Sequence, residues 1–157
     1  MSNDICVFVE HIRGQVSDIS YVLCAAAREL AGATGGHVIG LLIGHNVRGL
    51  ANDIGADLVR VVDDPALAEY LPDIHRHVLA DLVVAASPRA TLLGDTSMGA
   101  EVAGGLSVQL GVPLVSYCRR LRTESGTLKY ESQLCGGKIV VEGDLPGPSA
   151  LVAMIPG

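Results

Sequence analysis

The alternation of short, uninterrupted apolar runs with longer amphipathic stretches limits most strongly how this chain can fold. The first run, residues 5–9, reads ICVFV. It is followed by a stretch whose apolar residues recur at steps of three and four: Ile19, Val22, Leu23, Ala26, Ala27 and Leu30. A continuous apolar run of this length is typical of a strand buried on both faces, and the second pattern is typical of one face of a helix. The beginning of the chain therefore predicts a strand followed by a helix over residues 17–30.

The same alternation continues along the chain. It predicts further strands at residues 37–43, 58–62, 81–86 and 114–118, and helical segments at 46–54, 64–80, with a break near Pro72, and 97–110. Residues 87–95 are predicted to form a loop. Strands that alternate with helices predict a doubly wound, mostly parallel sheet between two helical layers, a three-layer α/β/α fold. With 157 residues, the chain is expected to form a single domain, residues 1–157.

The alternation stops after residue 118. A hairpin is predicted over residues 121–134 around Ser125-Gly126, followed by a turn at Gly136-Gly137 and short strands at 139–141 and 150–155. This closing series of strands predicts a short antiparallel C-terminal extension of the sheet.

Composition and charge limit the classes of partner that this protein is expected to bind. The net charge is −6, and the only basic cluster is Arg119-Arg120 with Arg122. Binding to a phosphate backbone or an anionic membrane surface needs many clustered cations, so neither nucleic acid nor a membrane surface is expected as a partner. No apolar run approaches the roughly 20 residues of a membrane span, and the first ten residues lack a basic segment typical of signal peptides. We expect a soluble, cytoplasmic protein without membrane insertion.

Neither a metal site nor a catalytic set can be recognised. His75 and His77 would lie roughly 200° apart on a helix, so they cannot easily share a metal ion. The sequence has no GxSxG, no GxGxxG after the first strand and no GxxxxGK[ST]. The four cysteines form no CxxC pair and are expected to be reduced, mostly inert thiols: Cys6, Cys24, Cys118 and Cys135.

One loop is a candidate for cofactor binding. The segment from Asp95 through Thr96 and Ser97 to Gly99 precedes a predicted helix. The free amides at a helix N-terminus can hold a phosphate, and open α/β sheets bind ligands beyond the carboxyl ends of their strands. The same residues are more typical of an ordinary hydroxyl cap on the helix, followed by a flexible loop. Both interpretations stay open from the residues alone.

The order of these segments resembles the N-terminal domain of the electron-transfer-flavoprotein α subunit. The residues that carry the resemblance are Val9-Glu10-His11, residues 55–64 (GADLVRVVDD), Gly99 to Leu110 with Gly111-Val112-Pro113, Cys135-Gly136-Gly137-Lys138 and the ending ALVAMIPG. Members of that family continue into a C-terminal FAD domain, whereas this sequence stops at Gly157. The late turn also differs, because Cys135 and Lys138 stand where the family has an aromatic residue and an Asn.

The resemblance implies pairing rather than catalysis. It suggests an α-like accessory subunit that docks with a β-like or flavin-bearing partner in electron transfer. Such a subunit would be a redox carrier or accessory and not an enzyme, with no cofactor bound by this chain alone and FAD or AMP possible at an interface. Self-association into a homodimer is a further possibility. The alternative is a small AMP- or ATP-binding protein of the universal-stress type, for which Thr96, Ser97 and Gly99 would be the nucleotide contacts.

Overall fold

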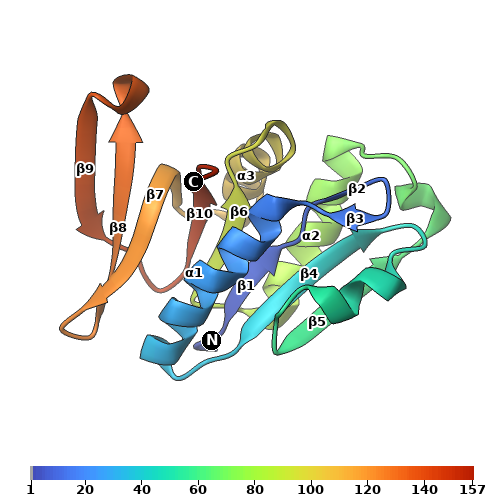
Figure 1. Cartoon of the computed structure of the whole chain (residues 1–157), viewed down its shortest axis with the longest axis horizontal. Helices are drawn as coiled ribbons and strands as arrows, with labels where there is room; N and C mark the ends of the chain where they lie inside the picture. Colours follow the sequence, from blue (N-terminus) through green and yellow to red (C-terminus); the bar gives the residue numbers. More distant parts are fainter. Residues whose placement is uncertain (1) are drawn as a thin grey trace.

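A mixed eight-stranded sheet forms the centre of the protein in the computed structural model, which describes residues 2–157 (Figure 1). Its strand order is β5-β4-β1-β6-β10-β7-β8-β9. The first six of these strands run parallel, and β8 runs antiparallel to both of its neighbours, β7 and β9. The bounds are β1 Ile5–Phe8, β4 Val38–Gly44, β5 Leu58–Asp63, β6 Ala90–Gly94, β7 Leu114–Glu124, β8 Thr127–Leu134, β9 Ile139–Asp144 and β10 Ala150–Met154.

Helices cover both faces of the sheet. They are α1 (Asp18–Thr34), α2 (Pro72–Ala86) and α3 (Ser97–Leu110), with short 3₁₀ segments η1 (Arg48–Asp53), η2 (Pro65–Leu67) and η3 (Cys135–Gly137). Figure 1 shows α1 in front of the sheet and α2 and α3 behind it. The predicted three-layer α/β fold with an antiparallel extension is therefore confirmed, but the last strand, which was predicted within that extension, is β10, which is parallel to its neighbours and lies between β6 and β7. Among the described residues, no helix is both long and apolar enough to cross a membrane.

The alternating side chains of β1 show how the layers are held together. Ile5 and Val7 belong to the core on the α1 face, whereas Cys6 and Phe8 belong to the core under α2 and α3. All four residues are buried. A parallel strand needs apolar side chains on both faces because helices cover both sides, which explains why its sequence is a continuous apolar run.

The prediction of a strand at residues 81–86 is wrong, because these residues form the last turns of α2. Val83 and Ala86 are buried together with Leu79 and Ala80, whereas Val84 is 66% exposed. That spacing is helical, although the run itself reads like a strand. The real strand at this place in the fold is β6, which lies inside the segment that was predicted to be a loop and is buried along its entire length.

Other differences are smaller. The segment predicted as one helix over 64–80 divides into η2 and α2, with the break before Pro72. Two residues of the first loop, His11–Ile12 (β2), pair with Gln15–Val16 (β3) in a small hairpin that the sequence did not reveal. The fifth strand continues well beyond residue 118, to Glu124, and forms the first arm of the predicted hairpin around Ser125-Gly126.

The chain reverses its direction of winding between β1 and β6. From β1 it passes through α1 to β4 on one side, whereas β6, on the other side of β1, leads through α3 to β7. Beyond the carboxyl ends of these two neighbouring strands, the connecting segments separate toward opposite faces of the sheet. This topological switch point is where open α/β sheets hold their ligands.

Candidate functional site

A buried carboxylate occupies the switch point. Glu10 lies two residues beyond the end of β1 and is only 5% exposed. Its backbone is fixed by Ser20 in the first turn of α1: the Glu10 N–H donates to Ser20 Oγ (2.8 Å), and that hydroxyl donates to the Glu10 carbonyl (3.1 Å). The Ser17 N–H donates to the same carbonyl (2.9 Å). This local network directs the Glu10 side chain toward the neighbouring strand end.

Thr96 links that carboxylate to the start of α3. Its hydroxyl donates to Glu10 Oε1 (2.7 Å) and accepts from the Gly99 N–H (3.0 Å), so one oxygen caps the helix and ties it to β1. Burial raises the pKa of Glu10, and the hydrogen bond from Thr96 partly offsets this effect. Thr96 is therefore a hydroxyl cap, one of the two interpretations that the sequence left open, and Glu10 is a partner that the sequence did not reveal.

Two glycines allow the strand ends to approach so closely. A Cβ atom on Gly99 would lie 2.0 Å from the Gly94 carbonyl oxygen and 2.7 Å from Glu10 Oε1. A Cβ atom on Gly94 would lie 2.8 Å from a side-chain carbon of Ile19 and 2.9 Å from Glu10 Oε1. Both positions are too crowded for any side chain. Gly99 thus serves packing at this junction, and it does not line the adjoining cleft.

A cleft of about 490 Å³ opens beside the junction. It is lined by Glu10, Ile12, Ser17, Ile19, Tyr70, Thr96, Ser97, Met98 and Glu101. Of the four residues predicted to bind a cofactor, Thr96 and Ser97 line this cleft, whereas Asp95 and Gly99 do not. The Asp95 N–H instead donates to the Met154 carbonyl (2.6 Å) at the end of β10, and burial raises the pKa of the Asp95 carboxyl.

Tyr70 separates the cleft from a smaller cavity of about 120 Å³ that includes His11, Arg13 and His75. The Tyr70 hydroxyl donates to the Met98 carbonyl (3.1 Å), and burial is the main cause that raises its pKa to about 12. His75 packs against the Tyr70 ring with a centroid distance of 4.9 Å. Burial lowers the pKa of His75, so its neutral ring is expected to donate from Nδ1 to the Leu71 carbonyl (3.1 Å). His75 is thus a buried histidine packed inside the protein.

The charges around the cleft define what it can bind. Glu10 and Glu101 are its ionisable carboxyls, and Glu10 already lies at the N-terminus of α3. A carboxylate at that position takes the place where an anionic phosphate would be most stable. The apolar walls and the acceptor oxygens suit an uncharged, hydrogen-bond-donating group better than a phosphate. Within residues 2–157, no three His, Cys, Asp or Glu side chains gather as metal ligands would.

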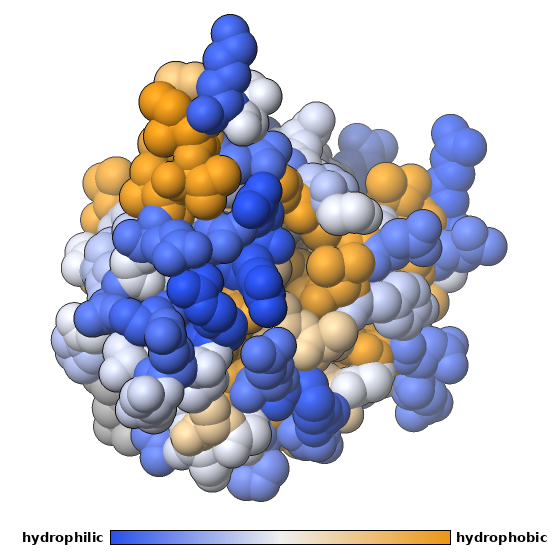
Figure 2. All heavy atoms as spheres, turned by 60° about the vertical axis from the view of Figure 1, so that its left-hand side comes forward, coloured by the Kyte–Doolittle hydropathy of each residue, from blue (hydrophilic) through white to orange (hydrophobic). Residues whose placement is uncertain are grey.

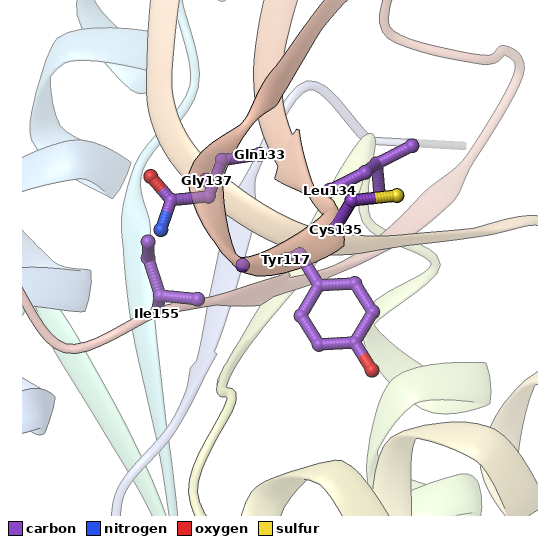
Figure 3. A pocket seen from close by; sticks show the side chains of 7 residues that line it. Tyr117, Gln133, Leu134, Cys135, Gly137 and Ile155 are labelled. Carbon is purple, nitrogen blue, oxygen red and sulfur yellow. The ribbon is translucent and has the colours of Figure 1, made fainter.

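A second hollow lies at the other end of the sheet, between η3 and the exit of β10. It measures about 300 Å³ and is lined by Tyr117, Gln133, Leu134, Cys135, Gly136, Gly137 and Ile155. Figure 3 shows the Tyr117 ring below the η3 loop, with Leu134 and Cys135 on one side and Ile155 on the other. Tyr117 is 53% exposed, and its φ of 54° lies where the register of β7 shifts against β10, just before its register against β8 shifts as well. Such a bulge re-aims a side chain, in this case out of the sheet.

Comparison with known proteins agrees with this architecture. The family model described as "Electron transfer flavoprotein domain" matches residues 5–157. The chain belongs to the electron transfer flavoprotein family. Because its relatives include α subunits of that family, it is an α-type domain, as the resemblance implied.

Three relatives illustrate the match. Protein FixB of Rhizobium meliloti (strain 1021) is 35% identical over 145 residues, which cover 87% of this chain and 41% of that protein. The electron transfer flavoprotein subunit alpha of Thermoanaerobacterium thermosaccharolyticum is 32% identical over 141 residues, covering 87% of this chain and 43% of the relative. The subunit LctC of the lactate dehydrogenase (NAD(+),ferredoxin) of Acetobacterium woodii is 32% identical over 142 residues, 88% and 34% of the two chains. The chain spans less than half the length of these relatives.

Proposed function

We propose that this electron-transfer-flavoprotein domain acts as a cytoplasmic docking subunit in flavin-based electron transfer. It would bind a β-like or flavin-bearing partner and would catalyse no reaction itself. FAD or AMP would be held at the interface with that partner rather than by this chain alone. The proposal rests on the family and on relatives that are named as subunits of electron-transfer assemblies.

The observation that carries the proposal is the apolar hollow at the antiparallel extension. Tyr117, Leu134 and Ile155 present apolar side chains around it, where the sheet passes from the strands covered by helices to β8 and β9 (Figures 1 and 3). Partly exposed aromatic side chains that line a hollow are typical anchors of protein interfaces. We therefore assign the hollow as the docking surface for the partner.

Co-expression with a β-type subunit of the family tests this proposal. We expect a stable complex whose flavin absorbance travels with both chains in size-exclusion chromatography. Tyr117→Asp should weaken the complex by about tenfold or more, because it places a charge at the centre of the hollow. Asp is tolerated at positive φ, so the variant should fold. Tyr21→Asp is the matched control, since Tyr21 is similarly exposed (44%) but lies on α1. Absence of any complex, or equal effects of the two variants, would refute the docking surface.

The cleft at the switch point supports a second candidate function, binding of an adenine nucleotide. Its volume and apolar walls suit a nucleoside, and Thr96 and Ser97 lie at its edge; Asp95 and Gly99 would contribute through the shape of the loop. Because Glu10 lies at the start of α3, adenosine should bind more tightly than AMP, and AMP more tightly than ATP. Calorimetric titration with the three ligands tests this order. No heat with any of them at millimolar concentration would remove the candidate.

A further inference from the structure

The outer edge of β9 has no partner in the part of the chain that the structure describes. β9 is the last strand of the sheet and pairs only with β8. That pairing runs without a register shift from Ile139 opposite Leu134 to Asp144 opposite Lys129. The strand is therefore regular over its length, and the hydrogen-bonding groups on its other side point away from the sheet. Such an edge is a template for another strand.

The sequence of β9 does little to protect this edge. Proteins usually blunt an edge strand with proline, a bulge or a central charge. At the opposite end of the sheet, β5 carries Arg60 near its middle. In β9 the first three positions, Ile139 to Val141, are apolar, and the charged side chains are Glu142 and Asp144 in its second half; Ile139 is 50% and Val140 46% exposed. Figure 2 shows hydrophobic side chains gathered at the top of this side of the molecule, where η3 joins β8 to β9 in Figure 1.

We propose that β9 pairs antiparallel with β9 of a second copy of this chain, with Val140 opposite Val140 of that copy. The two sheets would then continue into one another across a two-fold axis. On one face, Ile139 lies opposite Val141 of the second copy, twice by symmetry. Glu142 lies on the other face, close to Lys138 of the second copy, which immediately precedes the strand in a helical conformation (φ −74°, ψ −24°); this pair also occurs twice. The edge is thus complementary to itself in both shape and charge.

Neighbouring registers lack this complementarity. A two-fold axis perpendicular to the sheet places the two side chains of each cross-strand pair on the same face. The sum of the two residue numbers in a pair can therefore change only in steps of two. One shift places Val140 opposite Glu142, and the other places Lys138 opposite Val140. Either shift sets Val140 against a charged side chain and separates Ile139 from Val141 of the second copy, although the first shift keeps an opposite-charge pair between Lys138 and Asp144. The register centred on Val140 is therefore the preferred one.

The charged partners are free to take part. The side chain of Glu142 is 55% exposed, even though it contacts Arg122 (3.2 Å) within the chain. Lys138 is exposed and immediately precedes the strand. The contact is short, so its area falls at the small end of specific interfaces, and we expect a reversible dimer with a dissociation constant in the micromolar range.

Sedimentation velocity on the purified chain, over about two decades of concentration around that range, tests the dimer. We expect a monomer–dimer equilibrium for the unchanged chain. Val140→Lys should weaken it by about tenfold or more, because it sets two ammonium groups against each other at the axis. Val108→Lys introduces the same change on α3, where Val108 is 85% exposed, and should leave the equilibrium unchanged. A monomer at every concentration, or a dimer that Val140→Lys leaves intact, would overturn the proposal.

A charge swap tests the register itself. Lys138→Glu and Glu142→Lys should each weaken the dimer several-fold, because each sets like charges opposite one another across the interface. The double variant restores two opposite-charge pairs and should recover most of the affinity. Circular dichroism of each variant confirms that the monomer is folded. If the double variant dimerises no better than the single ones, the register is wrong. Because the purified chain suffices, this result is independent of whether the docking proposal above holds.

Discussion

The Glu10 carboxylate accepts a hydrogen bond from the Thr96 hydroxyl across 2.7 Å, which joins the end of β1 to the first turn of α3. The two residues are 86 positions apart in the sequence. Because Glu10 is almost completely buried, the bond supplies a partner for a group that would otherwise be costly to remove from water. This junction should therefore control stability at the switch point.

Removing the Thr96 hydroxyl should destabilise the protein. Thr96→Val deletes both the cap on Gly99 N and the donor to Glu10 Oε1. Loss of a cap and of a partner for a buried carboxyl should together lower the free energy of unfolding by about 2–4 kcal/mol. Urea denaturation measures the change. Thr96→Ser keeps the hydroxyl and should cost about 1 kcal/mol or less, so equal losses for Val and Ser would contradict this role.

The pKa of Glu10 predicts a pH dependence of stability. Burial raises it above its ordinary value of 4.5 in the folded state, so the folded protein holds this proton more tightly than the unfolded chain. The contribution of Glu10 to the free energy of unfolding is fully present below pH 4.5. It is lost as the pH rises through the pKa of Glu10 in the folded state. Glu10→Gln keeps an acceptor for Thr96 but does not titrate. The variant should gain stability relative to the natural chain as the pH rises from 4 toward about 7.

Paired urea titrations of the natural chain and Glu10→Gln measure this difference. The contributions of other carboxyls are the same in both proteins and cancel in the comparison. These include Asp57, whose pKa is lowered mainly by a hydrogen bond from Arg28, and Asp63, whose pKa is lowered mainly by a hydrogen bond from the Asn46 N–H. A difference in unfolding free energy that stays constant with pH would show that Glu10 titrates normally in the folded protein.

Two glycines of α3 should respond in opposite ways to alanine. At Gly99 the added Cβ would meet the Gly94 carbonyl oxygen at 2.0 Å, a backbone atom that cannot move aside cheaply, so we expect a loss of about 3 kcal/mol or more. At Gly104 the Cβ meets nothing within 4 Å, and alanine should stabilise the helix by about 0.5–1 kcal/mol. Thermal unfolding of the two variants checks both signs. A folded Gly99→Ala of normal stability would contradict the close packing.

Only one cysteine should react in the native protein. Cys135 is exposed, whereas Cys6, Cys24 and Cys118 are buried. Burial raises the pKa of Cys6 to about 12 and that of Cys118 to about 11, which disfavours the reactive thiolate. A thiol reagent should therefore label one site per native chain and all four cysteines after denaturation. Cys135→Ser should abolish the native reaction, and labelling that persists would show that a buried thiol becomes accessible.

Sequence periodicity predicted the fold correctly wherever the pattern of apolar residues fitted only one kind of element. The amphipathic stretch before Leu30 and the apolar run at residues 5–9 each fit one structure only. Residues 81–86 fit two, because two adjacent valines among alanines resemble a short buried strand, and burial on one side of α2 decided between them. The same error hid β6. Once residues 81–86 were interpreted as a strand, the short segment after Pro88 was interpreted as the loop that follows it.

The site was only partly predictable. The hydroxyl cap at Thr96 follows from local sequence, since a cap needs only its own helix. The partnership with Glu10 depends on β1 and β6 being neighbours, which no local pattern shows. An acidic residue directly after a buried strand was the available signal. Whether Asp95, Thr96, Ser97 and Gly99 bind a cofactor stays a prediction.

The position of β10 has a consequence for synthesis of the protein. Of the eight strands in this sheet, β10 is synthesised last, yet it lies between β6 and β7, and both of these strands pair with it and not with each other. Until residues 150–154 are synthesised, the strands from β5 to β6 cannot form one continuous sheet with β7, β8 and β9. The nascent chain would therefore carry two open strand edges, which is the kind of surface that chaperones protect from aggregation.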